Sequence, residues 1–302
     1  MNVKSLLRPA MIVIPFALGL CFPQAHILNQ HPIYFIPAAL TVMVFLSSLQ
    51  INWSDLGLKR QHLYLALCNI AMGLLPFYIC RLLLPEHPDI AKTAFFTGSM
   101  PTAAAAAVII SFLGGSVGFS LTGFAVTTLV LSLTMLGMLP AVSGVWSTAF
   151  LGSVCRSVCL LILLPVSSAF LIRKFFPNAA LWPKRCKNIT FSLWSIMIFV
   201  IAAIAGDYLQ KNPDIPLIKI LLPGVISLIL CIANFAVGRL IGGRNFSREC
   251  SQLLGQKNTS LGMYLALCYA DVIVAFGPVF YVLWHNAWNA IQLYCYERRQ
   301  KQ

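Results

Sequence analysis

The chain has 302 residues, of which 59% are hydrophobic and 10% are charged, and its mean hydropathy is +0.83. Soluble domains average about 45–50% apolar and 25% charged residues, so this composition excludes an ordinary soluble domain and indicates a polytopic membrane protein. A net charge of +13 would suggest nucleic-acid binding on a soluble protein. In a membrane protein basic residues are topology signals, and we expect no nucleic-acid partner.

Ten apolar segments follow one another along the chain, with short loops between them. A helix needs about 20 residues to cross ~30 Å of hydrocarbon. The first and seventh segments are shorter than this, so hydropathy defines their ends poorly. We read the first segment as a membrane span, because no signal-peptide cleavage site follows it. The segments are 7–22, 33–49, 63–84, 90–112, 119–146, 149–172, 189–205, 215–240, 250–269 and 272–294.

The basic residues set the expected orientation. With the N-terminus inside, most of the 21 Lys and Arg residues fall on the inner side. The outer side then holds only Arg81, Lys92, Lys211 and Lys219. This asymmetry predicts ten crossings with both termini cytoplasmic. We expect an integral protein of a bacterial inner membrane.

Two of the segments are interrupted by polar or helix-breaking residues. GSMPTAAAAA, with Pro101, interrupts 90–112, and GQKNTSLG, beginning at Gly255, interrupts 250–269. The interruptions are 154 residues apart (255 − 101), and Pro76 and Pro223 in other segments are 147 apart (223 − 76). Paired interrupted helices in two halves of a transporter indicate a binding site at mid-membrane depth.

These matched positions predict a five-plus-five repeat. The first repeat is 1–147, with segments one to five, and the second is 148–302, with segments six to ten. Because each repeat crosses the membrane an odd number of times, the second must be inverted relative to the first. The expected fold class is therefore an all-α membrane protein of ten helices in an inverted repeat, with discontinuous, crossed fourth and ninth helices.

Several stretches carry a resemblance to a known family. GQKNTSLGMYLA and FGPVFYVLWHNAWNAI resemble the bile acid:sodium symporter family, and so do SMPTAAAAA and VMVFLSSLQINWSDL. The resemblance covers essentially the whole chain. It implies ten helices in a panel domain and a core domain, and secondary transport of a small organic anion by alternating access. Family substrates include bile acids, pantoate and other carboxylates or sulfonates.

The resemblance also implies residues for the substrate site. Asn258 and Asn286 match positions that line the substrate cavity, although amides can equally join helices as interhelical glue. His285 either takes part in coupling or only donates to a backbone carbonyl. Thr102 is expected to cap the second half of its broken helix or to face substrate. Ala103 and Ala104 would leave backbone N–H groups open to an anion.

The sodium ligands of the family are mostly missing. Thr127 is the one matching side chain that stays a plausible oxygen ligand. Apolar or basic residues stand where the family has glutamate, glutamine, serine or asparagine: Leu253, Lys257, Ala106, Ala107, Ala71 and Gly123. Sodium needs oxygen ligands, and no carboxylate falls at mid-membrane depth. We therefore expect sodium-independent transport, with sodium held by backbone carbonyls as the alternative.

Lys257 is the residue that most needs an explanation. It lies in the polar interruption between Gln256 and Asn258, with Thr259 following, and intramembrane ionisable residues are functional by default. Our hypothesis is that its ammonium takes the place of the bound cation. It could tie the crossed helices together, attract an anionic substrate, or carry the coupling proton. The competing interpretation is that Lys257 snorkels to the membrane surface.

Other functional classes find less support in the sequence. An intramembrane enzyme needs a nucleophile with a base, or paired acids, and the segments carry no HExxH, GxSxG or phosphate loop. The ten cysteines show no CxxC spacing, and Cys155 and Cys159 only share a helix face. We expect no catalytic residue, metal site or cofactor. A channel or a receptor that does not transport remains an alternative to a carrier.

Overall fold

The computed structural model describes residues 14–30, 34–51 and 57–300. Within these ranges every regular element is a helix, and the only β-type pairing is one isolated bridge. Five helices are long and apolar enough to cross a membrane: Arg60–Leu83, Val117–Ser143, Thr148–Phe175, Asn188–Lys211 and Leu217–Gly242. The expectation of an all-α, multi-pass membrane protein is confirmed, whereas ten crossings and an inverted repeat stay predictions.

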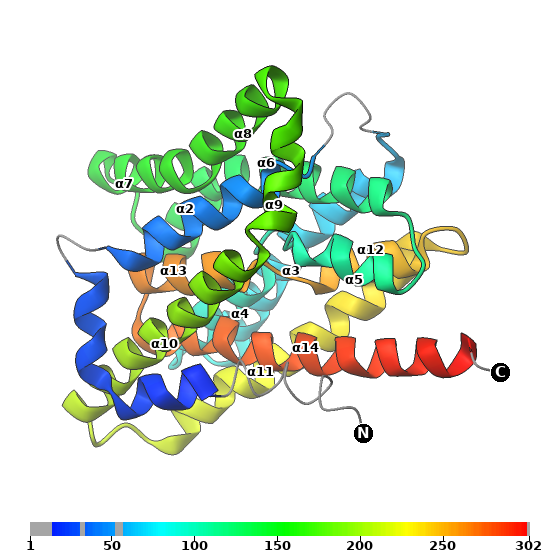
Figure 1. Cartoon of the computed structure of the whole chain (residues 1–302). Helices are drawn as coiled ribbons and strands as arrows, with labels where there is room; N and C mark the ends of the chain where they lie inside the picture. The colour runs from blue at the N-terminus through cyan, green and yellow to red at the C-terminus, as the bar shows by residue number, and fades with distance from the viewer. Residues whose placement is uncertain (1–13, 31–33, 52–56, 301–302) are drawn as a thin grey trace.

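The helices follow the apolar segments closely (Figure 1). A helix over 14–21 comes first, so the segment 7–22 lies only partly within the described residues. The elements after it are η1 (Pro23–Asn29), α2 (Phe35–Ser48), α3 (Arg60–Leu83), α4 (Pro88–Gly98), α5 (Ala105–Phe112), α6 (Val117–Ser143), α7 (Thr148–Val158), a π-helical turn η3 (Cys159–Leu163), α8 (Leu164–Phe175), η4 (Pro177–Leu181), α9 (Trp182–Arg185), α10 (Lys187–Lys211), α11 (Leu217–Gly242), α12 (Ser247–Gly255), α13 (Thr259–Tyr269) and α14 (Val272–Gln300).

Local sequence explains where several of these helices begin and end. The Ser116 hydroxyl accepts a hydrogen bond from the Phe119 amide at 3.3 Å and caps the start of α6. Gly144, with φ of +71°, ends the same helix in a left-handed conformation that suits glycine. The segment 90–112 divides into α4 and α5 around Pro101, and 250–269 divides into α12 and α13 after Gly255. Both interruptions therefore lie where the sequence predicts them.

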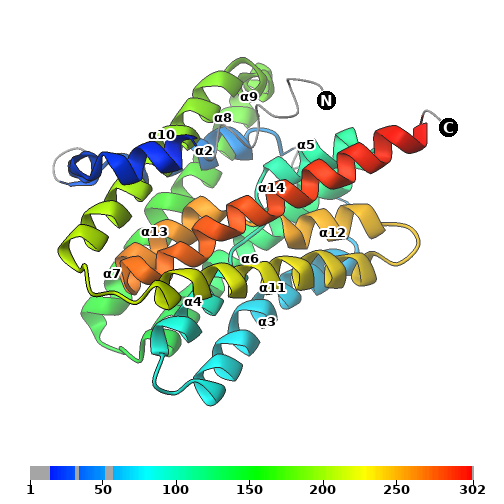
Figure 2. The same cartoon turned by 90° about the horizontal axis from the view of Figure 1, so that it is seen from below.

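The helices pack in two bundles that each draw on both halves of the chain. The first, called the crossing bundle here, consists of α3–α6 and α11–α14, so it contains both interrupted helices. The second, called the flanking bundle, consists of η1, α2, α7–α10 and the turns between them. Figures 1 and 2 show α2, α8 and α10 on one side of the molecule and α3, α11 and α12 on the other. The two interruptions lie inside the crossing bundle.

Glycine lets α3 and α4 approach each other closely. A Cβ atom added to Gly98 would lie 1.9 Å from the Met72 carbonyl oxygen, which belongs to the backbone and cannot move aside. We expect Gly98→Ala to lower the free energy of unfolding by about 1–3 kcal/mol, the usual cost of overpacking. Thermal unfolding of the purified protein in detergent measures the effect. Gly137→Ala is the matched control, because a Cβ there meets nothing within 4 Å; equal midpoints for the two variants would contradict the prediction.

Candidate functional site: a lysine buried where two broken helices cross

The two helix interruptions pair with each other through their backbones. The Ala103 amide donates to the Gln256 carbonyl at 2.8 Å, and the Asn258 amide donates to the Pro101 carbonyl at 2.8 Å. Thr102 and Lys257 thereby face each other in an isolated antiparallel bridge. Backbone groups left open by the breaks find partners in one another, as buried polar groups in a membrane protein must. This pairing fixes how α4 and α5 cross α12 and α13.

Hydroxyl groups satisfy the carbonyls at the end of α12. The Thr102 hydroxyl donates to the Leu253 carbonyl at 2.5 Å, and the Tyr281 hydroxyl donates to the Gly255 carbonyl at 2.9 Å. The Asn234 amide in turn donates to the Tyr281 hydroxyl at 3.2 Å. The last turn of α12 is therefore held by side chains from three other places in the chain.

Lys257 points into the protein. Its side chain is 1% exposed, which excludes snorkelling to the membrane surface. The ammonium donates a hydrogen bond to the Oδ1 atom of Asn69 on α3. Asn69 is itself fully buried, and its Nδ2 atom donates to the Leu65 carbonyl at 2.9 Å. That second bond orients the amide so that its oxygen faces the ammonium.

No carboxylate compensates the charge of Lys257 in the part of the chain that the structure describes. The ion pairs in that part of the chain all involve Asp207, which pairs with Lys211 and His26 rather than with Lys257. The α12 helix ends just before Lys257 and α13 begins just after it, so the opposite dipoles of these two helix ends offset each other. A buried ammonium without a partner costs several kcal/mol, and the partner that the described residues give it is the Asn69 amide oxygen.

Apolar packing fills the position where the family resemblance implies a sodium-binding glutamate. Leu253 is fully buried in a hydrophobic cluster with Ala106, Ile110 and Phe119. A Cβ atom on Gly123 would lie 2.5 Å from the Leu253 Cδ1 atom, so the leucine occupies the space that a side chain at position 123 would need. Leu253 and Gly123 therefore make a close-packed apolar contact between α12 and α6.

Thr127 makes its hydrogen bonds within its own helix. Its hydroxyl, fully buried, donates to the Gly123 carbonyl at 2.9 Å and to the Phe124 carbonyl at 3.2 Å. Back-bonding of this kind is common for threonine in apolar helices. The side chain therefore has a structural role that needs no cation.

The crossing brings together Thr102, Ala103, Gln256 and Lys257 from the predicted site. Thr102, however, does not cap α5, since that helix begins after Ala104 without a side-chain cap. Both alanines, Ala103 and Ala104, are half-buried, and Gln256 is 3% exposed. Thr259 is buried at the first position of α13.

The three remaining candidates have local roles. Asn258 caps α13, because its Oδ1 atom accepts from the Leu261 amide at 3.2 Å. The Asn286 side chain donates to the Val282 carbonyl of its own helix at 2.8 Å. His285 is 6% exposed and packs edge-on against Tyr281, with ring centroids 5.6 Å apart. Its Nδ1 atom makes no hydrogen bond to any residue that the structure describes.

A small apolar crevice lies where the two bundles meet. Its walls are Phe16 and Ile198 from the flanking side and residues of α13 and α14 from the crossing bundle: Met263, Val279, Val282 and Leu283. Its volume of about 10 Å³ holds roughly one water molecule. None of the predicted substrate residues lines it.

Comparison with known proteins does not assign the chain to a family. No known family model matches the chain, and a search of characterised proteins finds no match. What the fold and site define is a multi-pass helical membrane protein with a buried cation at the crossing of two broken helices.

Proposed function

We propose that this protein is a secondary carrier for a small organic anion, of the bile acid:sodium symporter type, and that it works by alternating access. The observation that carries the proposal is the pairing of the two helix interruptions, one from each half of the chain. Crossed, discontinuous helices at a repeat interface are how many secondary transporters build their binding site. In this proposal ten spans form two inverted repeats, 1–147 and 148–302.

The two bundles correspond to the two moving parts of such a carrier. The crossing bundle takes the place of the core domain and the flanking bundle that of the panel domain. The crevice described at their interface, of about 10 Å³, is too small for an organic anion, so in this proposal binding and release are coupled to movement of one bundle against the other. Asn258, Asn286 and His285 would reach substrate in a conformation where this interface is open.

Two helix N-termini make the crossing suitable for an anion. α5 begins at Ala105 and α13 at Thr259, directly after the paired interruptions. Helix N-termini attract carboxylates and sulfonates through their free N–H groups and their positive partial charge. The Ala103 amide already donates to Gln256, and the Leu261 amide of α13 to Asn258. The proposed anion contacts are therefore the amides of Ala104 and Ala105 at the start of α5, beside methyl side chains only. We therefore assign a carboxylate or sulfonate as the substrate group.

Lys257 supplies the positive charge that a bound sodium ion supplies in the symporters. Its ammonium is buried inside the crossing bundle on the Asn69 oxygen, and the position that would carry a glutamate is filled by Leu253. The coupling ion in this proposal is a proton carried by Lys257. A sodium ion held by backbone carbonyls is the second candidate, because both interruptions expose non-helical backbone, including the Pro101 and Gln256 carbonyls, at the crossing.

The test is uptake without sodium. Purified protein in proteoliposomes is given labelled taurocholate or pantoate, with sodium replaced by choline, against protein-free liposomes as the control. We expect the same initial rate with and without sodium, and accumulation above the external concentration when a pH gradient is imposed. A strict sodium requirement would support the carbonyl-held ion instead. Equilibration without accumulation would indicate a channel.

A further inference from the structure

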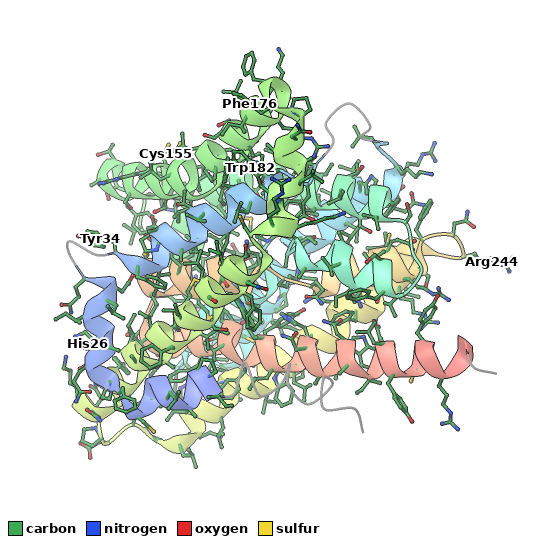
Figure 3. The ribbon with its side chains drawn as sticks, in the orientation of Figure 1. His26, Tyr34, Cys155, Phe176, Trp182 and Arg244 are labelled. Carbon is green, nitrogen blue, oxygen red and sulfur yellow. The ribbon has the colours of Figure 1, made fainter. Side chains whose placement is uncertain are left out.

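The turn between α8 and α10 follows a helix that is longer than the hydrocarbon thickness of a bilayer. The continuous helix Thr148–Phe175 has 28 residues and is therefore about 42 Å long, against ~30 Å of hydrocarbon. η4 (Pro177–Leu181) and α9 (Trp182–Arg185) follow before α10 turns back. Figures 1 and 3 show this turn projecting from the body of the molecule, with Phe176 near its tip. We call residues 173–185 the α8–α9 turn.

Large aromatic side chains are exposed on the α8–α9 turn. Phe175 is 69% exposed, Phe176 is 65% exposed and Trp182 is 39% exposed. Phenylalanine side chains with this exposed fraction are unfavourable in water, because their apolar surface stays hydrated. Aromatic rings at the end of a membrane-spanning helix are stable at the level of the lipid headgroups. The turn is therefore suited to lie in the membrane interface.

Pairs of basic residues flank these aromatic residues in the sequence and form no ion pair within the described residues. Lys174, Lys184 and Arg185 are exposed, and Arg173 donates to the Leu49 carbonyl at 2.6 Å, which ties the turn to α2. The sequence contains no Asp or Glu between Asp89 and Asp207. Within the described residues, none of these four basic side chains forms an ion pair. The turn thus carries uncompensated positive charge next to exposed rings.

From this arrangement we infer that the α8–α9 turn is a binding surface for the headgroups of anionic phospholipids. The rings of Phe175, Phe176 and Trp182 enter the interface, and Lys174, Lys184 and Arg185 bind the phosphates. Amphipathic elements with basic and aromatic residues bind anionic lipid surfaces in this way. Each basic residue near such a surface strengthens the attraction about fivefold. The inference is independent of what the protein transports.

The competing explanation is a diffuse attraction shared by all cytoplasmic basic residues. The end of α11 and the turn after it allow the two to be separated, because Arg239 in the last turn of α11 and Arg244 in the following turn are also exposed. The aromatic residue of that turn, Phe246, is instead half-buried and stacks on Phe119 with ring centroids 4.3 Å apart. Figure 3 places Arg244 on a different projection of the molecule from Phe176.

Tryptophan quenching by brominated lipids tests the inference on the full chain. The protein is reconstituted in phosphatidylcholine vesicles in which a fraction is brominated phosphatidylcholine or brominated phosphatidylglycerol. We expect brominated phosphatidylglycerol to quench the tryptophan fluorescence more strongly than brominated phosphatidylcholine does. Trp182→Phe should remove that difference. Lys184→Ala with Arg185→Ala should lower the preference for phosphatidylglycerol about 25-fold, whereas Arg239→Ala with Arg244→Ala should leave it unchanged. Equal quenching by the two lipids in the wild type, or equal loss in both double variants, would overturn the inference.

Discussion

Lys257→Met should strongly lower the accumulation of substrate that a pH gradient drives, while the protein stays folded. Methionine has nearly the length of lysine and no charge, so it fills the same buried space next to Asn69. A proton drives transport only if it binds the inward- and outward-open states with different affinity. Couplings of this kind are typically worth 5–150-fold, so we expect pH-driven accumulation to fall by at least about fivefold. Proteoliposomes in choline buffer, with taurocholate or pantoate as the probe, give the measurement.

Two further variants separate charge from proton transfer. Lys257→Arg keeps a positive charge but does not release a proton, so it should preserve folding and lose the pH dependence. Lys219→Met, at an exposed position near the start of α11, should behave as the wild type. Persistence of the wild-type pH dependence in Lys257→Met would show that this lysine does not carry the coupling proton.

Asn69→Leu should destabilise the protein strongly, and Lys257→Met should reverse most of that loss. The leucine removes the one hydrogen-bond acceptor that the structure gives the buried ammonium. Leaving a charged buried donor unpaired costs about 3 kcal/mol. When methionine replaces the lysine as well, both polar partners are gone, and such apolar pairs can be nearly neutral.

A double-mutant cycle on thermal or detergent unfolding measures this coupling. The double variant should be more stable than Asn69→Leu alone, with an interaction energy on the order of 1–3 kcal/mol. Asn286→Leu is the control, because the Asn286 side chain bonds to a carbonyl of its own helix rather than to the lysine. Simple additivity of Asn69→Leu and Lys257→Met would mean that the hydrogen bond between them does not stabilise the fold.

The helix interruptions could be predicted because their causes are local. Pro101 has no N–H to donate, and a polar run such as Gln256 to Thr259 does not continue an apolar helix. Hydropathy and these two signals were enough to place α4, α5, α12 and α13 within a few residues. It could also be predicted that Lys257 needs a polar partner inside the protein, since an ionisable residue amid apolar segments requires one.

The partner of Lys257 and the packing around it could not be predicted. Asn69 is seven residues before Pro76 in the sequence, and only the rotation of α3 about its axis turns its amide toward the crossing. The contact of Leu253 with Gly123 depends on how α12 and α6 pack. Capping of α5 was one of the two roles expected for Thr102, yet α5 has no side-chain cap and it is Asn258 that caps its own half-helix, α13. A polar side chain in an apolar segment is expected to bond to the backbone. Which polar residue caps a given helix depends on the path of the chain.

The bridge between Thr102 and Lys257 also constrains how the protein is made. The two residues are 155 positions apart (257 − 102), so at about 5–20 residues per second the ribosome adds the second interruption roughly 8–30 s after the first. Throughout that interval the Pro101 carbonyl and the Ala103 amide lack their final partners. The first half must therefore wait in a conformation different from the mature one, with its break shielded by water, by the insertion machinery or by temporary helical bonds. Assembly of the crossing is thus a late event in biogenesis, and a chain cut before α12 has no means of completing its own first half.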